Sequence, residues 1–374
     1  MLVDAHMVGT HETGNETYIV NLLQELGRLP QLRCGAALLP AMVPSLNLAG
    51  VDRVPLRFSA DWFRLAFALP VACRIWRADV LHVTYVGPFW RPCPLVVSVH
   101  DVAFKRYADF FSPRDRLLFA TLLPLTLRRA NAVITISAHA QQEILKLFPY
   151  LEGKVHVTQL APSPLFRHVS DRKALDSVRA RYGIHSDFVL AVGNLQPRKN
   201  LLRLVRAFAS VRAEIGPVQL VIVGKEQWKS SSLYETVRRL GLEREVIFPG
   251  YVPDENLVPL YSAARMLAYP SIYEGFGLPI LEAMACGTPV VASNTSAMPE
   301  VAADAALLVD PYEQRQIARA IVELIKNRAL ALSLSERGLE RARRFCWRKT
   351  AEKTLRVYEN VAGFDPGKTV RGRN

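Results

Sequence analysis

Short apolar runs rich in β-branched residues recur along the whole chain, and each run is followed by a longer segment with helical periodicity. Runs that are apolar throughout suit strands buried on both faces, and helices between them imply parallel crossover connections. Six runs precede residue 160, at residues 2–5, 34–39, 80–83, 95–99, 132–136 and 154–158. Six more follow it, at residues 188–192, 218–223, 245–248, 266–269, 289–292 and 306–309. The pattern predicts an α/β protein.

The break between the two sets of runs predicts two doubly wound domains rather than one large sheet. It is the segment Leu160-Ala161-Pro162-Ser163-Pro164, which is rich in proline and has no helical period. A length of 374 residues agrees with two or three domains. We therefore expect one domain at residues 1–164 and another at residues 165–346.

The composition and the net charge indicate what kind of molecule the protein binds. Half of the residues are apolar and 22% are charged, which excludes a disordered chain or a coiled coil. The formal net charge of +13 favours an anionic partner: a phosphate-bearing substrate, an anionic membrane surface or nucleic acid. No basic tail of the nucleic-acid-binding kind stands out, so nucleic acid is not the expected partner.

The chain shows no targeting signal that we recognise. A carboxylate appears at Asp4, and no charged region precedes an apolar one, so we expect no signal peptide and a cytoplasmic protein. The cysteines are odd in number and have no C-x-x-C spacing, which favours reduced, buried thiols over a disulfide framework or a zinc site. They are Cys34, Cys73, Cys93, Cys286 and Cys346.

The segment from Ser271 to Glu282 carries the strongest sign of a binding site. It follows the run at residues 266–269, and its glycines precede good helix formers, with Pro279 suited to the first helical turn. Free amides at a helix start, with glycines that let a ligand approach, form an anion site. Glu274 would lie at the carboxyl end of a strand, where ligands bind in open α/β sheets. Taken alone, the two glutamates also fit a solvated charge and a residue that stabilises the helix dipole.

A second polar segment follows the run at residues 188–192. It reads Gly193-Asn194-Leu195-Gln196-Pro197-Arg198-Lys199-Asn200 and places two cations side by side where the next helix opens. Arginine offers a planar fork and lysine a point charge, a combination suited to a diphosphate. Cations at a helix N-terminus oppose the helix dipole, so we expect an anion to bind there.

These motifs together resemble glycosyltransferase family 4. The resemblance rests on the two glutamates with seven residues between them, on the turn at residues 193–200, and on the segment Glu282-Ala283-Met284-Ala285-Cys286-Gly287-Thr288-Pro289-Val290-Val291-Ala292. Members are retaining enzymes of the GT-B fold that use nucleotide-diphosphate sugars. The resemblance implies two Rossmann-like domains facing across a cleft, the acceptor side at residues 1–164 and the nucleotide-sugar side at 165–346. Within residues 347–374, a helix that begins at Trp347 would cross back to the first domain.

The resemblance also implies roles for individual residues. Glu274 would hold hydroxyls of the donor sugar and act in catalysis, and Glu282 would bind the ribose. The diphosphate would lie on Arg198 and Lys199. The remaining donor contacts would come from the turn that frames the nucleobase, at Val252, and from the loop amides of Gly275, Phe276, Gly277 and Leu278.

Two pieces of the first half complete this assignment. His100 directly follows the run at residues 95–99, and the resemblance places its imidazole beside the donor sugar as a catalytic residue, although a lone histidine is more often structural. The loop at residues 9–15 matches the loop that contacts acceptor and diphosphate but lacks the paired glycines. Gly14 is therefore a donor-binding candidate and Asn15 a weaker one.

The expected reaction is attack by an acceptor hydroxyl on the anomeric carbon of the donor. No D-x-D motif lies near the site, so we expect no metal site and no obligatory cofactor. Similarity to bacterial mannosyltransferases of polysaccharide assembly makes GDP-mannose the first expected donor, with UDP-hexoses as the alternative. The acceptor would be a glycan or a lipid-linked molecule.

Three other interpretations stay open. A nucleotide-sugar epimerase would turn over donor without an acceptor. A phosphorylase of the pyridoxal type would carry a Schiff-base lysine and a longer chain. A non-enzymatic binder of anionic ligands would interleave aromatic and basic residues.

The first half also suggests peripheral contact with an anionic membrane. Bulky apolar residues and arginines mix at residues 62–67, 74–77 and 114–129, and an interfacial helix needs an apolar face with a cationic rim. The alternative is that these aromatic side chains pack on the sheet.

Overall fold

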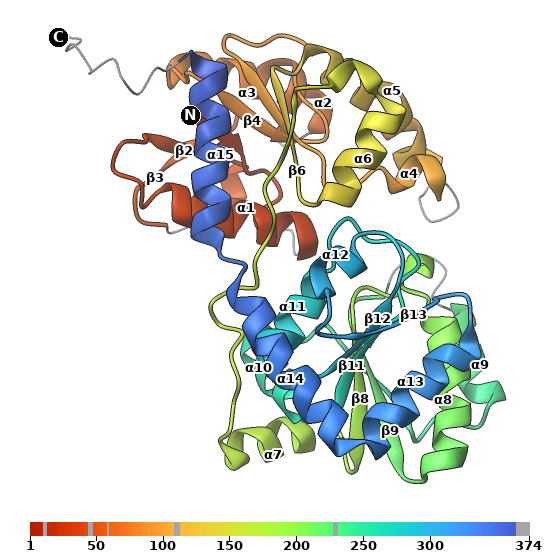
Figure 1. Ribbon diagram of the computed structural model, residues 1–374. Coiled ribbons are helices and arrows are strands. Elements are labelled where there is room, and N and C mark those ends of the chain that lie inside the picture. The colour runs from red at the N-terminus through yellow and green to blue at the C-terminus, as the bar shows by residue number, and fades with distance from the viewer. Residues whose placement is uncertain (10–12, 44–47, 58–59, 108–112, 227–230, 364–374) are drawn as a thin grey trace. The chain divides into compact units, whose positions relative to one another are not determined.

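The computed structural model describes residues 1–9, 13–43, 48–57, 60–107, 113–226 and 231–363. The chain divides into two compact units (Figure 1). The first unit is Met1–Leu160 with the segment that begins at Trp347, and the second unit is Ala161–Cys346. No helix in these ranges is both long and apolar enough to cross a membrane.

The first unit is built on a parallel sheet in the order β3-β2-β1-β4-β5-β6-β7. The strands are β1 Leu2–Asp4, β2 Cys34–Leu38, β3 Val51–Pro55, β4 Leu81–Thr84, β5 Leu95–Ser98, β6 Ala132–Thr135 and β7 Val155–Val157. The α-helices are α1 Thr13–Leu26, α2 Asp61–Phe63, α3 Leu69–Ile75, α4 Ala103–Arg106, α5 Pro113–Arg129, α6 Ala138–Leu147 and α15 Trp347–Ala362. A π-helical turn, Arg64–Ala68, joins α2 to α3.

The second unit is built on a parallel sheet in the order β10-β9-β8-β11-β12-β13. The strands are β8 Asp187–Val192, β9 Val218–Val223, β10 Val246–Gly250, β11 Met266–Tyr269, β12 Val290–Ser293 and β13 Leu307–Val309. The helices are α7 Arg172–Arg181, α8 Leu201–Ile215, α9 Ser231–Arg239, α10 Asp254–Ala263, α11 Leu278–Ala285, α12 Met298–Ala302, α13 Gln314–Lys326 and α14 Arg328–Arg343.

Both sheets reverse their strand order once, between β1 and β4 in the first unit and between β8 and β11 in the second. This is the doubly wound arrangement, and ligands of such sheets bind where the order reverses, outside the carboxyl ends of the strands. The predicted α/β class, with two doubly wound sheets, is therefore confirmed. The reversal between β8 and β11 places the loops that follow these two strands next to each other.

All twelve apolar runs are strands, but the sequence analysis missed β3. This strand reads Val-Asp-Arg-Val-Pro, and its residues are exposed or only partly buried. It forms one edge of the first sheet, so it pairs with a neighbour on one side only. Edge strands keep charged side chains and proline, and a search for continuous apolar runs does not find them.

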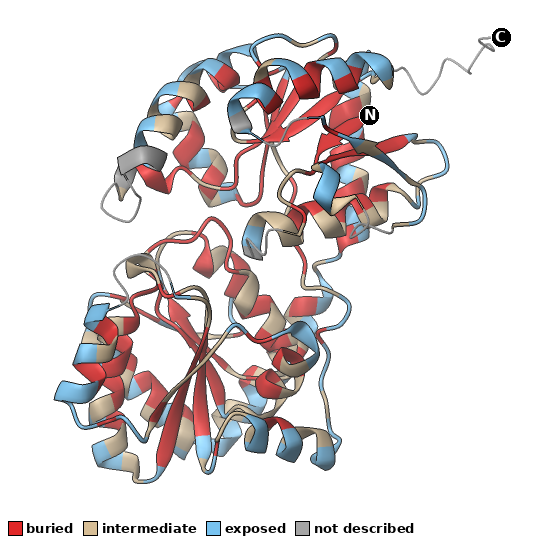
Figure 2. Ribbon diagram, turned by 180° about the vertical axis from the view of Figure 1, so that it is seen from behind, coloured by how far each residue is buried: buried red, intermediate tan, exposed pale blue. Residues whose placement is uncertain are grey.

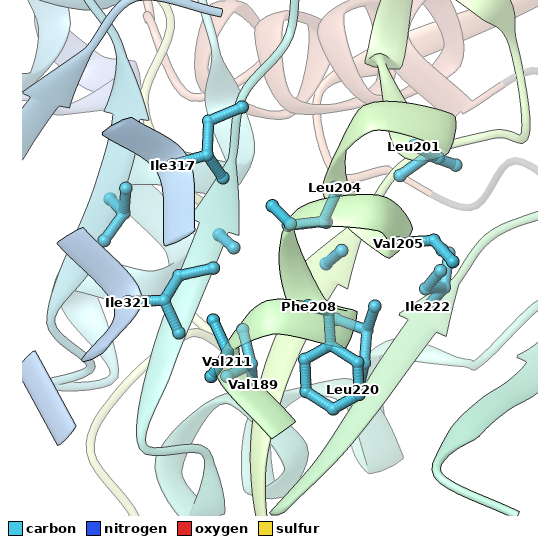
Figure 3. Packing of buried hydrophobic residues seen from close by; sticks show 14 of the residues in the cluster. Val189, Leu201, Leu204, Val205, Phe208, Val211, Leu220, Ile222, Ile317 and Ile321 are labelled. Carbon is cyan, nitrogen blue, oxygen red and sulfur yellow. The ribbon is translucent and has the colours of Figure 1, made fainter. Parts of the chain in front are cut away.

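The core of the second unit forms where α8 packs on the sheet. Leu204, Phe208 and Val211 project from α8 at helical spacing and are fully buried. Figure 3 shows them near Val189 and Leu220 of the sheet, and the inner strands of the unit are buried along most of their length (Figure 2). The helix that was expected to open after Arg198 and Lys199 is α8.

Helix α15 is attached to the first sheet by a buried polar chain. The Tyr358 hydroxyl lies 2.6 Å from Nδ1 of His82 on β4, and Nε2 of His82 lies 2.7 Å from the Ser98 hydroxyl on β5. The Tyr18 hydroxyl of α1 lies 2.8 Å from the same serine. Burial lowers the pKa of His82 to about 3, so the imidazole is neutral and hydrogen-bonded at both nitrogens.

The expectation that the thiols are buried is correct for four cysteines and wrong for Cys346, which is exposed. Cys346 follows α14 and directly precedes α15, at the point where the chain passes from the second unit back to the first. A residue in a short connection between helices keeps solvent on one side. Cys73 and Cys93 are buried with their sulfur atoms 3.1 Å apart.

Replacing Tyr358 by phenylalanine is expected to destabilise the first unit by about 1–3 kcal/mol, because one nitrogen of buried His82 loses its partner. Urea unfolding followed by tryptophan fluorescence measures the change. Tyr150→Phe is the matched control, since Tyr150 is exposed and its hydroxyl lies 3.5 Å from the Pro124 carbonyl. Equal midpoints for the two variants would contradict the proposed role of the Tyr358 hydroxyl.

Candidate active site

Two cations and one carboxylate meet where β8 and β11 lie side by side. Arg198 and Lys199 belong to a 3₁₀ turn, Pro197–Lys199, in the loop after β8, and Glu274 lies in the loop after β11. Nη1 of Arg198 donates to Oε2 of Glu274 at 2.5 Å, and Nζ of Lys199 lies 2.7 Å from Oε1. The structure thus brings together three predicted site residues. Their ion pairs were not part of the prediction.

Because Lys199 and Glu274 are buried, the charge of each depends on the other. Lys199 is 8% exposed and Glu274 is 6% exposed. Burial raises the pKa of Glu274, but Arg198 and Lys199 outweigh that effect and lower its pKa to about 2. Burial lowers the pKa of Lys199 to about 8, against the opposing effect of Glu274. At neutral pH the three groups keep one net positive charge, which suits an anionic ligand.

Lys199 lies against Tyr269 and Gly193, which the sequence analysis did not single out as site residues. Its ammonium donates to the Tyr269 hydroxyl at 2.7 Å and lies 4.8 Å from the centre of the same ring. A Cβ atom on Gly193, which has a φ of 144°, would lie 2.8 Å from Cε of Lys199. Gly193 is therefore small because the lysine side chain passes over it. A tyrosine at the end of an apolar strand was the available signal for Tyr269.

Asn200 fixes the loops of three strands to one another. It has a φ of 60°, in the left-handed region that asparagine tolerates better than most residues. Its side-chain amide donates to the carbonyl of Pro270 at 3.0 Å, after β11, and to that of Pro311 at 2.7 Å, after β13. The asparagine that follows Arg198 and Lys199 thus positions the turn that carries them.

Hydroxyl groups at the end of β12 and directly after it hold the backbone that presents Glu274. Ser293 donates to the carbonyl of Ser271 at 2.7 Å, and Thr295 donates to that of Ile272 at 3.2 Å. Ser296 donates to the carbonyl of Glu274 at 2.6 Å and accepts from its amide at 2.8 Å. The sequence analysis missed this group, although three hydroxyl residues at the end of an apolar run were visible.

The loop from Gly275 to Leu278 leads into α11 as expected. Gly277, with a φ of 105°, precedes the helix, and no side chain caps the helix start. Pro279 has no N–H and the Ile280 amide donates to the Gly277 carbonyl at 3.0 Å, so an anion here would meet the amides of the loop and of Leu278. Phe276 is buried, with its ring 5.9 Å from that of Phe345. Phe276 can therefore offer a ligand its backbone rather than its ring.

Glu282 and Val252 lie on neighbouring elements of the second unit. Glu282 on α11 accepts a 2.9 Å hydrogen bond from the Tyr261 hydroxyl of α10, and burial raises the pKa of this carboxyl to about 7. Val252, after β10, is 3% exposed, so only its backbone can meet a base. Tyr251 beside it is exposed, and Nζ of Lys225 lies 5.3 Å from the centre of its ring.

In the first unit, His100 follows β5 and is held by α1. Its Nδ1 lies 2.8 Å from Oδ1 of Asn15, and the centres of its ring and of the Tyr18 ring lie 4.6 Å apart in a T-shaped arrangement. Burial lowers the pKa of His100 to about 4, so the imidazole is neutral. Within the described residues, its Nε2 is buried and has no hydrogen-bond partner. A buried nitrogen of this kind is suited to a ligand hydroxyl.

The loop before α1 is only partly described. Gly14 lies in the first turn of α1 and is exposed, with no atom near the place of a Cβ. Residues 10–12 of the same loop lie outside the described residues. Across the described ranges, no group of three or more His, Cys, Asp or Glu side chains is arranged to hold a metal ion.

Comparison with known proteins places both units among glycosyltransferases. The family described as Glycosyl transferases group 1 matches residues 179–341, and the family described as Glycosyltransferase Family 4 matches residues 13–159. The O-antigen chain mannosyltransferase B of Escherichia coli is 34% identical over 287 residues, which are 75% of this chain and 75% of the relative.

Solved structures show the same fold at lower identity. A sucrose-phosphate synthase from Thermosynechococcus elongatus has a TM-score of 0.76 at 22% identity, over 97% of this chain and 99% of the other. Anabaena HepE, solved in complex with UDP and glucose, has a TM-score of 0.75 at 21% identity, over 96% of this chain and 98% of the other. At these identities the similarity supports the fold.

The Gly193→Ala substitution is expected to displace Lys199 and to lower the urea midpoint more than Gly216→Ala does. Both glycines have a positive φ, but nothing lies within 4 Å of the Cβ position at Gly216. When Lys199 is also replaced by alanine, the added methyl group meets no lysine side chain. The additional loss of stability caused by Gly193→Ala should then largely disappear. A double-mutant cycle measures this coupling, and additive effects would contradict the close approach.

Proposed function

Because the chain belongs to the glycosyltransferases of the GT-B fold, we propose that it is a retaining family 4 enzyme that transfers a hexose from a nucleotide-diphosphate sugar to an acceptor hydroxyl. The observation that carries this proposal is the cluster of Arg198, Lys199 and Glu274 where β8 meets β11. Its net positive charge, beside the uncapped start of α11, matches a diphosphate.

The reaction needs stabilisation of the leaving group. The acceptor oxygen forms a bond to the anomeric carbon, the bond from that carbon to the diphosphate oxygen breaks, and its electron pair stays on the diphosphate. In the proposed mechanism that oxygen also takes the proton of the acceptor hydroxyl, on the same face of the sugar. Arg198, Lys199 and the amides of residues 275–278 would stabilise the charge where it develops.

Glu274 would change partners when the donor binds. In the structure it neutralises part of the charge on Arg198 and Lys199. A bound diphosphate would take over these cations, and the carboxylate would then be able to accept hydrogen bonds from sugar hydroxyls. Glu282 would bind the ribose, and the backbone of Val252 would frame the base.

His100 would assist as a neutral hydrogen-bond acceptor. If Nδ1 donates to Oδ1 of Asn15, as the 2.8 Å contact indicates, Nε2 carries the lone pair. A sugar hydroxyl would then donate to Nε2, which has no partner among the described residues. Asn15 would act as a positioning residue, and Gly14 would let the donor approach the start of α1.

We propose GDP-mannose as the donor and mannose as the transferred sugar. The support is the 34% identity to an O-antigen chain mannosyltransferase. UDP-hexoses are the alternative, since HepE was solved with UDP and glucose. The acceptor would be a hydroxyl of a growing glycan, free or linked to a lipid.

Turnover of Glu274→Gln is expected to fall about a hundredfold or more, while GDP and UDP bind at least as well as to the unmodified protein. In this variant Arg198 and Lys199 no longer pair with a carboxylate. Both cations therefore remain available to the diphosphate. Release of nucleoside diphosphate from GDP-mannose and UDP-hexoses measures turnover, and thermal shift measures binding and folding. Glu313→Gln, at an exposed glutamate before α13, is the control. Unchanged turnover would disprove the role of Glu274.

We further propose that the first unit docks on an anionic membrane surface at the inner face of the membrane. Trp62, Phe63, Phe67 and Ile75 are between 54% and 75% exposed on α2, the π-helical turn and α3. The rings of Trp62 and Phe89 lie 5.8 Å apart, so the apolar surface extends to the loop before β5. Exposed aromatic side chains of this kind suit a lipid interface.

The segments at residues 62–67 and 114–129, which were expected to form the membrane contact, contain both exposed and buried side chains. Leu65 and Arg64 are buried, and Arg64 pairs with Asp4 of β1. Phe119 of α5 packs against the ring of Phe104. Leu117 is 66% exposed on the same helix, and Arg116, Arg128 and Arg129 are exposed as well. The side chain of Arg114 lies outside the described residues.

The protein is expected to co-sediment with anionic liposomes at low salt and to be released as salt rises, because each cation near such a surface contributes about 1 kcal/mol. Replacing Arg128 and Arg129 by glutamate should weaken sedimentation. The matched control replaces Arg238 and Arg239, an exposed pair at the end of α9 in the second unit. A protein that stays in the supernatant, or equal loss in both variants, would contradict docking through the first unit.

A further inference from the structure

A basic cavity lies in the first unit, apart from the residues discussed so far. It has a volume of about 420 Å³ and is formed by the edge strand β7, helix α15 and Gln141 of α6. This volume lies within the range of small-molecule sites, about 300–1,000 Å³. A single bare ion does not need that much space.

The charged groups of this cavity are all basic. Lys353 and Arg356 are three residues apart on one face of α15, and His156 projects from β7. Among the described residues, neither Lys353 nor Arg356 is paired with a carboxylate, and no Asp or Glu lines the cavity. Arg348 on the same helix does have such a partner, Glu352, at 3.1 Å.

The cavity also contains a buried hydroxyl group without a partner. Thr158 is 1% exposed, and its Oγ1 forms no hydrogen bond with any described residue. Leaving a buried polar group unsatisfied costs about 1–3 kcal/mol, so such groups usually meet water or a ligand. Thr158 is one of the residues that line the cavity with the two unpaired cations, and a small movement of its side chain would let the hydroxyl donate to an anion bound there.

We propose that this cavity binds the phosphate group of a small phosphorylated molecule. Arg356 offers a planar fork, Lys353 a point charge and Thr158 a hydroxyl donor, which together match the several oxygens of a phosphate group. The exposed Asn360 offers an amide to the remainder of the ligand. The site does not depend on the proposed transferase activity, because it shares no residue with the cluster of the second unit.

The cavity lies close in sequence to both connections between the units. Thr158 shortly precedes Leu160, where the chain leaves the first unit, and Lys353 shortly follows Trp347, where it returns. Gln159 and Thr350 are already joined, since the Thr350 hydroxyl donates to the Gln159 carbonyl at 2.5 Å. A ligand held by Thr158 and Lys353 would strengthen this link between the two connecting segments.

The test is the titration of His156 by NMR in phosphate and in chloride buffers of equal ionic strength. Lys353 and Arg356 face His156 from α15, Gln141 faces it from α6, and partial burial lowers the pKa of the imidazole. A bound phosphate anion favours the charged imidazolium, so the pKa of His156 should be higher in phosphate by about half a unit or more. His156→Gln identifies the resonance.

Two double variants of α15 show whether the shift in the pKa of His156 comes from phosphate bound in this cavity. Replacing Lys353 and Arg356 by alanine should remove the difference between the two buffers, whereas replacing Arg348 and Lys349 of the same helix should preserve it. The shift should also saturate as phosphate is added at constant ionic strength. Equal pKa values in both buffers, a shift that never saturates, or a shift that survives the Lys353/Arg356 double variant would each overturn the proposal.

Discussion

Lys199 stays charged in the interior of the second unit because Glu274 lies 2.7 Å from it and Tyr269 accepts its hydrogen bond. A buried ion pair is stable only when its two groups are held close together, because a charge without its partner is costly in a medium of low polarity. The two residues are 75 positions apart and follow different strands. Their contact therefore requires that β8 and β11 be neighbours and that both loops be fixed.

The rest of the site can be understood as support for that contact. Gly193 leaves room for the lysine stem, Asn200 ties the turn to the loops after β11 and β13, and Ser296 holds the backbone of Glu274 from both sides. These groups place two cations before any ligand arrives. A diphosphate that binds there would displace only the contacts of the cations with Glu274, while the turn that carries the cations stays fixed, and such fixed positions favour electrostatic stabilisation.

The positive charge of the chain lies in different surroundings in the two units. In the second unit, the cations of the site are partly or fully buried and share a carboxylate. In the first unit, basic groups lie exposed at the end of α5 and along α15. Salt screens exposed cations much more than buried ones, so the two sets would differ in how firmly they hold an anion. The net charge of +13 alone does not distinguish these arrangements.

The sequence by itself determined twelve strands, because a strand buried on both faces must be apolar along its length. It also pointed to Arg198, Lys199 and Glu274 as candidate site residues, and these three side chains meet in the structure. It did not reveal β3, whose exposed edge position imposes no apolar pattern. Nor did it reveal the bonds of Lys199 to Glu274, of Ser296 to the Glu274 backbone, or of Tyr358 to His82. Local patterns record which faces of a segment are buried. Contacts between distant segments are decided by strand order and register, which only the tertiary structure sets.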